Sequence, residues 1–72
     1  MMKIADAKDF GAAIRARRKQ LNYTQAQLAS FTGFSVSFLS DLENGKETAE
    51  IGKALFIAQT LGIDMELRER GQ

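Results

Sequence analysis

The chain has 72 residues, a formal net charge of +1, and neither cysteine nor histidine. This length makes one domain near the lower size limit for a core that is stable without metals, disulfides or a second chain, which favours a partner subunit. The missing residue types exclude a disulfide framework, a thiolate nucleophile, an imidazole base and the usual zinc sites, so the residues of ordinary enzyme mechanisms are lacking.

The charge is unevenly distributed along the chain. Residues 1–20 hold six basic and two acidic side chains and sum to +4, whereas residues 21–47 sum to −2 and residues 48–72 to −1. A basic segment of this kind can face a polyanion although the whole molecule is nearly neutral. Because no apolar run resembles a signal core or is long enough to span a bilayer, we expect no membrane partner and a cytoplasmic location.

The first predicted helix occupies "AKDFGAAIRARRKQL" and is capped by Asp6 or Asp9. Gly11 is unfavourable inside a helix and hints at close packing. The residues of one helical stripe, spaced three or four apart, are Phe10, Ile14, Arg18 and Leu21.

The next two predicted helices are short and are joined by a turn at Gly33. Thr24 can cap "QAQLAS", which ends before "TG", and Ser35 can cap the helix that follows. One face of that third helix is apolar and the other polar, with Phe38, Leu39 and Leu42 buried and Val36, Ser37, Ser40 and Asp41 pointing the other way. Asn44 and Gly45 supply a left-handed stop.

Thr48 is predicted to cap a fourth helix that ends at Gly62. The core stripe of this helix is expected to comprise Ile51, Leu55, Ala58 and Leu61. Beyond it, in "GIDMELRER", Ile63, Met65 and Leu67 alternate with charged residues, which is typical of a strand with one buried face. Met65 and Leu67 can fold back over their own subunit. Strict alternation and the unpaired strand edge instead favour a sheet shared by two copies, which would cover the fourth helix.

Two short helices joined by a glycine turn, the second presenting small polar side chains, form a helix-turn-helix arrangement. The major groove of B-form DNA admits one helix, and small residues on the leading face of that helix let its backbone approach the base edges. The residues therefore predict that the third helix enters the groove.

The segments "TQAQLA", "TGFS" and "SFLSDLENGK" resemble the phage-repressor-like (XRE/Cro-type) helix-turn-helix regulators, over nearly the full chain. Within that family, "TAEIGKALFIAQTLGI" and the alternating tail look most like HipB-type antitoxins of toxin–antitoxin modules, in which the terminal strand pairs with its copy in a dimer. The resemblance implies a mainly α fold, a four- to five-helix lambda-repressor-like domain. The DNA-binding domain would occupy residues 1–62, and a dimerisation strand and tail would occupy residues 63–72, with Ile63, Met65 and Leu67 in the dimer.

The resemblance also implies which residues touch DNA. Thr24 and Gln25 open the second helix, where the side chain and backbone N–H of Gln25 meet a phosphate. The groove-facing positions are Ser35, Val36, Ser37 and Ser40, with Asp41 at the edge. Asn44 and Lys46 match positions that touch the other flank of the groove.

Arg18 and Glu43 match a pair that joins the first helix to the end of the third, so we expect a structural role for them. In the basic run "RARRKQ" we predict phosphate contacts for Arg17 and Lys19, and rank Arg15 below them. An ordinary solvated helix face with one buried ion pair explains this run almost as well.

This sequence departs from the family in its readout chemistry. Many relatives place Arg, Lys or Gln at the groove positions, whereas this helix offers hydroxyls and Val36, which can touch a thymine methyl group. Asp41 can accept a hydrogen bond from cytosine, select against other bases, or simply be exposed. Phe31 is a second departure, because relatives usually have a polar residue there.

We therefore expect a homodimeric, sequence-specific repressor of an inverted-repeat operator. Its narrower form is the antitoxin of a HipBA-like module that represses its own operon and binds a HipA-like kinase toxin, without a cofactor. The alternatives are a stand-alone repressor and a protein–protein adaptor anchored by Phe31 and Phe34. A metal site is not predicted, because the acidic residues lack the spacing of a calcium loop; they are Asp41, Glu43, Glu47 and Glu50.

Overall fold

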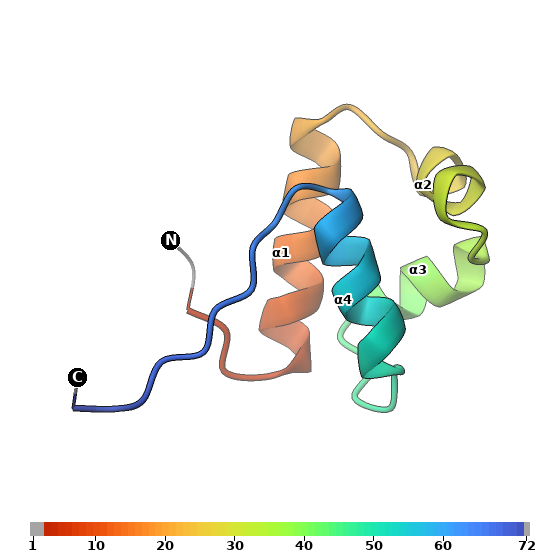
Figure 1. Cartoon of the computed structure of the whole chain (residues 1–72). Coiled ribbons are helices and arrows are strands. Elements are labelled where there is room, and N and C mark those ends of the chain that lie inside the picture. Colours follow the sequence, from red (N-terminus) through yellow and green to blue (C-terminus); the bar gives the residue numbers. More distant parts are fainter. Residues whose placement is uncertain (1–2, 72) are drawn as a thin grey trace.

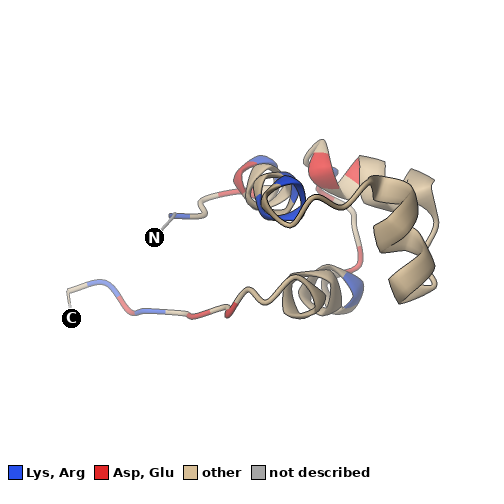
Figure 2. Cartoon of the chain, turned by 90° about the horizontal axis from the view of Figure 1, so that it is seen from above, with Lys and Arg blue, Asp and Glu red and all other residues tan. Residues whose placement is uncertain are grey.

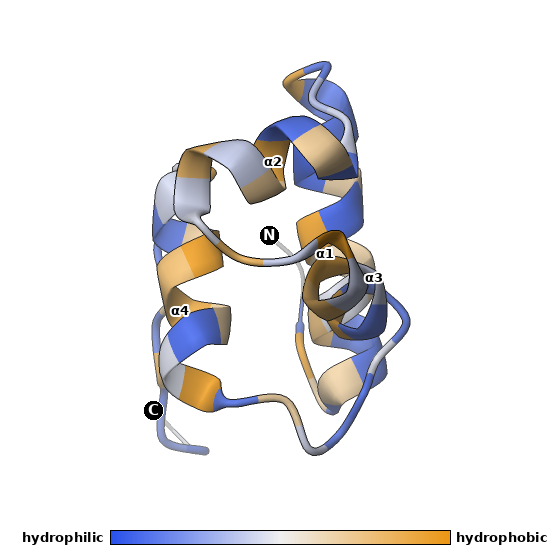
Figure 3. Ribbon diagram, turned by 90° about the vertical axis from the view of Figure 1, so that its right-hand side faces the viewer, coloured by the Kyte–Doolittle hydropathy of each residue, from blue (hydrophilic) through white to orange (hydrophobic). Residues whose placement is uncertain are grey.

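The computed structural model describes residues 3–71, and over this range the chain forms four helices and no strand (Figure 1). The helices are α1 (Ala7–Gln20), α2 (Gln25–Thr32), α3 (Val36–Glu43) and α4 (Ile51–Thr60). α2 and α3 lie together on one side of the molecule, and the C-terminal segment leaves on the other side (Figures 1 and 3). Across residues 3–71, none of the helices has the length and apolarity that crossing a membrane requires.

Three helices begin at the predicted capping residues. The Asp6 side chain accepts a hydrogen bond from the Asp9 backbone N–H at 2.8 Å, so Asp6 is the cap of α1. Thr24 and Gln27 form a reciprocal capping box at α2, and the Ser35 hydroxyl accepts a hydrogen bond from the Phe38 N–H at 3.0 Å. These short-range contacts fix where the helices of the central pair begin.

The prediction for the start of α4 is wrong. The helix begins at Ile51 with Glu50 in the capping position, and no side chain caps it. Thr48 instead lies in a turn in which the Ala49 N–H donates to the Lys46 carbonyl oxygen at 3.3 Å. As the first residue of the helix, Ile51 lies beyond the core and is 75% exposed.

The buried face of α4 is accordingly shifted from the predicted stripe. Its buried residues are Ala54, Ile57 and Ala58, followed by Leu61, whereas Leu55 is only half-buried. The left-handed stop after α3 also differs. Gly45 has a φ of 85°, but Asn44 has a φ of −88° and is not left-handed.

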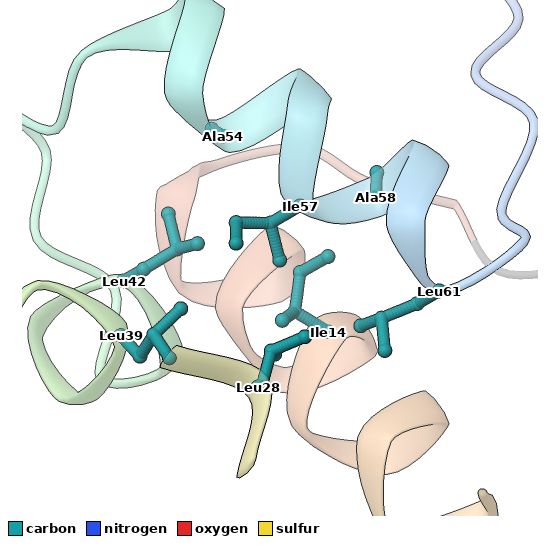
Figure 4. Packing of buried hydrophobic residues seen from close by; sticks show 8 residues of the cluster. All are labelled: Ile14, Leu28, Leu39, Leu42, Ala54, Ile57, Ala58 and Leu61. Carbon is teal, nitrogen blue, oxygen red and sulfur yellow. The ribbon is translucent and has the colours of Figure 1, made fainter. Parts of the chain in front are cut away.

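The core draws residues from all four helices, and its large side chains point toward one another (Figure 4). Its buried members are Ile14, Leu28, Leu39, Leu42, Ala54, Ile57, Ala58 and Leu61. Gly11 explains how α1 approaches α3 so closely. A β-carbon at position 11 would lie 2.7 Å from the Glu43 carbonyl oxygen and closer still to that of Leu42. Only glycine fits this crossing without displacing a helix.

Residues 63–69 run as an extended segment without a hydrogen-bonded ladder in the single chain (Figure 1). The Ile63 N–H donates to the Ala58 carbonyl oxygen at 2.9 Å, and its side chain packs against the core. Met65 is 45% exposed and Leu67 is fully exposed, so neither side chain folds back to cover α4. The expected strand is absent here, because a ladder needs a second strand and one chain offers none.

Candidate nucleic-acid interface

The α2–α3 unit packs against the core, and a turn at Gly33 connects its two helices. Leu28 of α2 and Leu39 of α3 are fully buried in the core that also contains Ile14 of α1. Gly33 has a φ of 79°, and its N–H donates to the Ala29 carbonyl oxygen at 2.8 Å, which ends α2 sharply. The inner face of α3 is thus fixed, and its outer face is left free.

That outer face carries the predicted groove residues. Ser35, Val36, Ser37 and Asp41 are exposed, and Ser40 is half-buried. Three of these residues are serines, and Val36 has the largest side chain among Ser35, Val36, Ser37 and Ser40. A helix with such a face can approach base edges closely, and hydroxyl groups can both donate and accept there.

Gln25 links the start of α2 to the end of α3. Its side-chain Nε2 donates to Glu43 Oε1 at 3.1 Å, so the predicted phosphate-binding amide already has one protein partner. The second amide hydrogen and the backbone N–H remain at the helix N-terminus, where an anion is favoured. Thr24, the cap of α2, is exposed beside it.

Arg18 and Glu43 form the expected pair between α1 and the end of α3. Arg18 Nε lies 2.7 Å from Glu43 Oε2, and Arg18 Nη2 lies 2.9 Å from Glu43 Oε1. Arg18 Nη1 also donates to the Tyr23 carbonyl oxygen at 2.7 Å. The two side chains are 9% and 3% exposed, so they stabilise the frame and present little surface to a ligand.

Burial and hydrogen bonding act in opposite directions on this pair. Burial raises the pKa of Glu43, but hydrogen bonds from Arg18 and Gln25, with the nearby positive charges, outweigh it and leave the pKa below its usual value. The hydrogen bond to Glu43 raises the pKa of Arg18 further. Both groups therefore stay charged, and the contact between α1, α2 and α3 persists across the neutral range.

The negative charge of Asp41 is compensated by a neighbouring cation. Lys46 Nζ lies 3.4 Å from Asp41 Oδ2, and both side chains are about half exposed, at 54% and 53%. Asn44 is exposed at the end of α3, and its Nδ2 lies 3.5 Å from Ser40 Oγ. The structure thus places both predicted flank residues, Asn44 and Lys46, beside the polar face of α3.

The two predicted phosphate contacts on α1 point to different places. Arg17 Nε donates to the Leu61 carbonyl oxygen at 2.8 Å, so this side chain serves the end of α4 and is not brought to the α2–α3 surface. Lys19 lies on another face of α1. Arg15, ranked lower from the sequence, lies beside Gln25 and Asn44. Position 15 falls four residues before position 19, a spacing that could have identified this shared face.

The aromatic side chains divide into two clusters. Phe31 is 59% exposed and meets Tyr23 edge to face, with ring centroids 5.1 Å apart. Phe34 packs against Phe38 and Phe56 at 5.3 and 5.8 Å. Of the two residues considered as adaptor anchors, Phe31 is therefore the more exposed one.

Within residues 3–71, no three His, Cys, Asp or Glu side chains come together as a metal site would require. Glu43, one of the four acidic residues considered above, is occupied by Arg18.

Comparison with known proteins agrees with this geometry. The chain matches the helix-turn-helix family HTH_3 over residues 14–67. It is 41% identical over 70 residues to an uncharacterized HTH-type transcriptional regulator, y4mF, of Sinorhizobium fredii, covering 97% of this chain and 92% of that protein. It is 49% identical over 39 residues to the competence pilus inhibition repressor of Acinetobacter baylyi, covering 54% of this chain and 36% of that protein.

Solved structures are similar over almost the whole chain. HipB in the HipB–O4 20mer complex superimposes with a TM-score of 0.87 at 26% identity, covering 97% of this chain and 99% of that one. The HipA–HipB–O2–O3 complex contains a chain that matches with the same TM-score, identity and coverage. The chain therefore belongs to the helix-turn-helix family of DNA-binding transcriptional regulators, which are not enzymes.

Proposed function

We propose that the protein is a repressor that reads an inverted-repeat operator as a homodimer and serves as the antitoxin of a HipBA-like module. The observation that carries the DNA-reading part is the small-residue outer face of α3, fixed by Leu39 within and by the Arg18–Glu43 pair at its end. Ser35, Val36, Ser37 and Ser40 would contact base edges, while Thr24, Gln25, Asn44 and Lys46 would contact the backbone on either flank.

The dimer would be closed by residues 63–67. Met65 and Leu67 are exposed apolar side chains on an extended segment, and a second copy of that segment is the simplest partner for its free backbone groups. The superposition with HipB leaves only about 3% of this chain outside, so most of this segment lies within the similar part. Two copies of α3 would then lie about 34 Å apart, one turn of DNA, which gives the operator its two-fold symmetry.

The antitoxin role rests on the similarity to HipB, which one of the matching structures contains together with HipA. A kinase-like toxin would be the partner here, and Phe31 offers an exposed apolar anchor for it. The second candidate is a stand-alone repressor. It is favoured by the match to the competence pilus inhibition repressor, which spans 39 residues and only 36% of that protein.

Truncation after Gly62 tests the dimer and the operator together. All eight buried core residues precede this position, so residues 1–62 retain them and lose only the partly buried Ile63 from the edge of the core. We expect full-length protein to sediment as a dimer and to protect an inverted repeat upstream of its own gene in a footprinting assay. The truncated protein should be monomeric and should lose that protection. A truncated protein that remains a tight dimer would refute the shared strand and move the interface to α4.

A toxin partner is tested separately, by copurification from the native host. A kinase-like protein that copurifies at a fixed ratio supports the antitoxin role. If none copurifies and no such gene lies beside this one, the protein is a stand-alone repressor.

A further inference from the structure

The unit that would read DNA carries no positive charge of its own. Between Thr24 and Asn44 the charged residues are Asp41 and Glu43, both acidic. Figure 2 shows this lack of positive charge: α2 and the neighbouring start of α3 carry no basic residue. Lys46 follows α3, but its ammonium group is paired with Asp41. Since phosphate neutralisation by Lys and Arg supplies most sequence-independent affinity, the cations must come from another element.

One face of α1 meets this requirement. Lys8, Arg15 and Lys19 line an open hollow of about 330 Å³, together with Ala12 and Ala16 of α1 and with Glu43 and Asn44 from the end of α3. These α1 positions are spaced three or four residues apart and therefore share one helical face. The two alanines leave the space between the cations open to a ligand. We call Lys8, Arg15 and Lys19 the α1 basic face.

The hollow is continuous with the predicted DNA contacts. A second hollow beside it is lined by Arg15, Arg18, Gln25, Glu43 and Asn44. It thus shares Arg15, Glu43 and Asn44 with the first hollow, and it reaches Gln25 at the start of α2. A DNA strand bound at Gln25 and Asn44 would pass the α1 basic face within reach of its long side chains.

These cations are available to a ligand. Lys8, Arg15 and Lys19 are exposed, and among residues 3–71 the ion pairs involve other cations: Arg18, Lys46, Lys53 and Arg68. The one carboxylate that lines the hollow belongs to Glu43, which is buried and bound by Arg18. Glu43 interacts electrostatically with Arg15, but its ion pair is with Arg18, so none of the three side chains has an ion-pair partner in the hollow.

We propose that the α1 basic face binds backbone phosphates of the operator outside the groove that α3 reads. The ligand is the DNA backbone, because the face adjoins the DNA-reading helices and a phosphate ladder matches three cations along one helix. The two helices would then have separate roles: α3 supplies selectivity without any positive charge of its own, and α1 supplies the electrostatic attraction. The inference rests on the proposed DNA-reading function.

The test compares salt dependence of binding for matched variants. The probes are a fluorescent duplex selected by the wild-type protein from a random pool and an unselected duplex of the same length. For Arg15→Gln with Lys19→Gln, the slope of log affinity against log salt concentration should become shallower by about 1.8 per protomer on both duplexes, about 0.9 for each lost phosphate contact. The control, Lys3→Gln with Lys53→Gln, removes the same charge at exposed positions elsewhere and should keep the wild-type slope.

Two further variants make the result specific to phosphate binding. Arg15→Lys with Lys19→Arg keeps the charges and should keep the slope. Lys8→Gln with Lys19→Gln leaves Arg15 in place and should make the slope shallower by the same amount. This second variant keeps the test valid if Arg15→Gln with Lys19→Gln fails to fold.

The contrary outcomes are distinct. An unchanged slope in both neutralised variants overturns the α1 basic face as a phosphate site and leaves the surface to another kind of partner. An equal decrease in the control overturns it in favour of net charge alone. A wild-type protein that selects no duplex refutes the proposed function itself, before any variants are compared.

Discussion

Arg18→Ala is the change whose effect on stability the structure defines best. The guanidinium group donates two hydrogen bonds to Glu43, at 2.7 and 2.9 Å, and one to the Tyr23 carbonyl oxygen at 2.7 Å. Alanine removes all three. The Glu43 carboxylate, 3% exposed, then keeps only the hydrogen bond from Gln25 at 3.1 Å.

The expected loss of stability follows from the buried Glu43 carboxylate, which is left without its ion-pair partner. Removing one partner of a buried pair costs about 3 to 5 kcal/mol, and water entering the space left by the arginine reduces this, so we expect a loss of about 3 kcal/mol. A domain of this size has a total stability of roughly 4 to 11 kcal/mol, at about 0.05 to 0.15 kcal/mol per residue. At about 4 to 8 °C per kcal/mol, the melting temperature should fall by roughly 12 to 24 °C.

Urea unfolding followed by circular dichroism measures this loss. The wild type, Arg18→Ala, Glu43→Gln and the double variant form a cycle whose coupling energy isolates the pair. Arg15→Ala is the matched control, an exposed arginine on the same helix whose loss should change stability by less than about 0.5 kcal/mol. If Arg18→Ala melts like the wild type and only its affinity for DNA falls, then Arg18 is a phosphate contact and the structural role is wrong.

The same pair sets a dependence on pH. The pKa of Glu43 is lower in the folded protein than in the unfolded chain, so its stabilising contribution is complete above its ordinary pKa. This contribution is lost as the pH falls from the ordinary pKa of glutamate through the lower pKa of Glu43 in the folded protein. Wild-type stability should decrease over that acid range more steeply than that of Glu43→Gln, and parallel curves would contradict this assignment.

Two further predictions concern α1 and α4. Gly11→Ala should destabilise the protein by about 1 to 3 kcal/mol through collision with the carbonyl oxygens of α3, whereas Gly52→Ala, which meets no atom within 4 Å, should stabilise it by about 0.5 to 1 kcal/mol. Equal effects on the unfolding midpoint would show that the crossing is not tight. Arg17→Ala should cost about 1 kcal/mol by freeing the Leu61 carbonyl oxygen, and should leave the salt dependence of DNA binding unchanged. A shallower slope would show that Arg17 reaches a phosphate after all.

The parts of the fold that the sequence predicts well depend on contacts within a few residues. Asp6, Thr24 and Ser35 each bind a backbone N–H three residues ahead, so a capping residue before an apolar run was enough to find the helix starts. Thr48 carries the same signal and is not a cap. The turn between α3 and α4 decides where α4 begins, and residue types alone do not determine its conformation.

The placement of the candidate site residues was predictable to a similar extent. The outer face of α3 follows from helical periodicity, because Leu39 and Leu42 leave the opposite side to solvent. The directions of the Arg17 and Arg15 side chains could not be predicted in the same way. The direction of Arg17 is set by a free carbonyl oxygen at the end of α4, a partner 44 residues away in the chain. Whether residues 63–67 form a strand is harder still to predict, since the pairing strand would belong to a second molecule.

Binding of the selected duplex by Ser37→Glu with Ser40→Glu tests the central claim most directly. Each glutamate adds length and negative charge to the outer face of α3, and neither position belongs to the buried core. The control, Ser30→Glu with Gln59→Glu, adds the same charge at exposed positions on α2 and α4. We predict that the α3 variant unfolds within about 0.5 kcal/mol of the wild type yet loses specific binding, while the control keeps it. A folded α3 variant that retains specific binding would contradict the reading of DNA by α3.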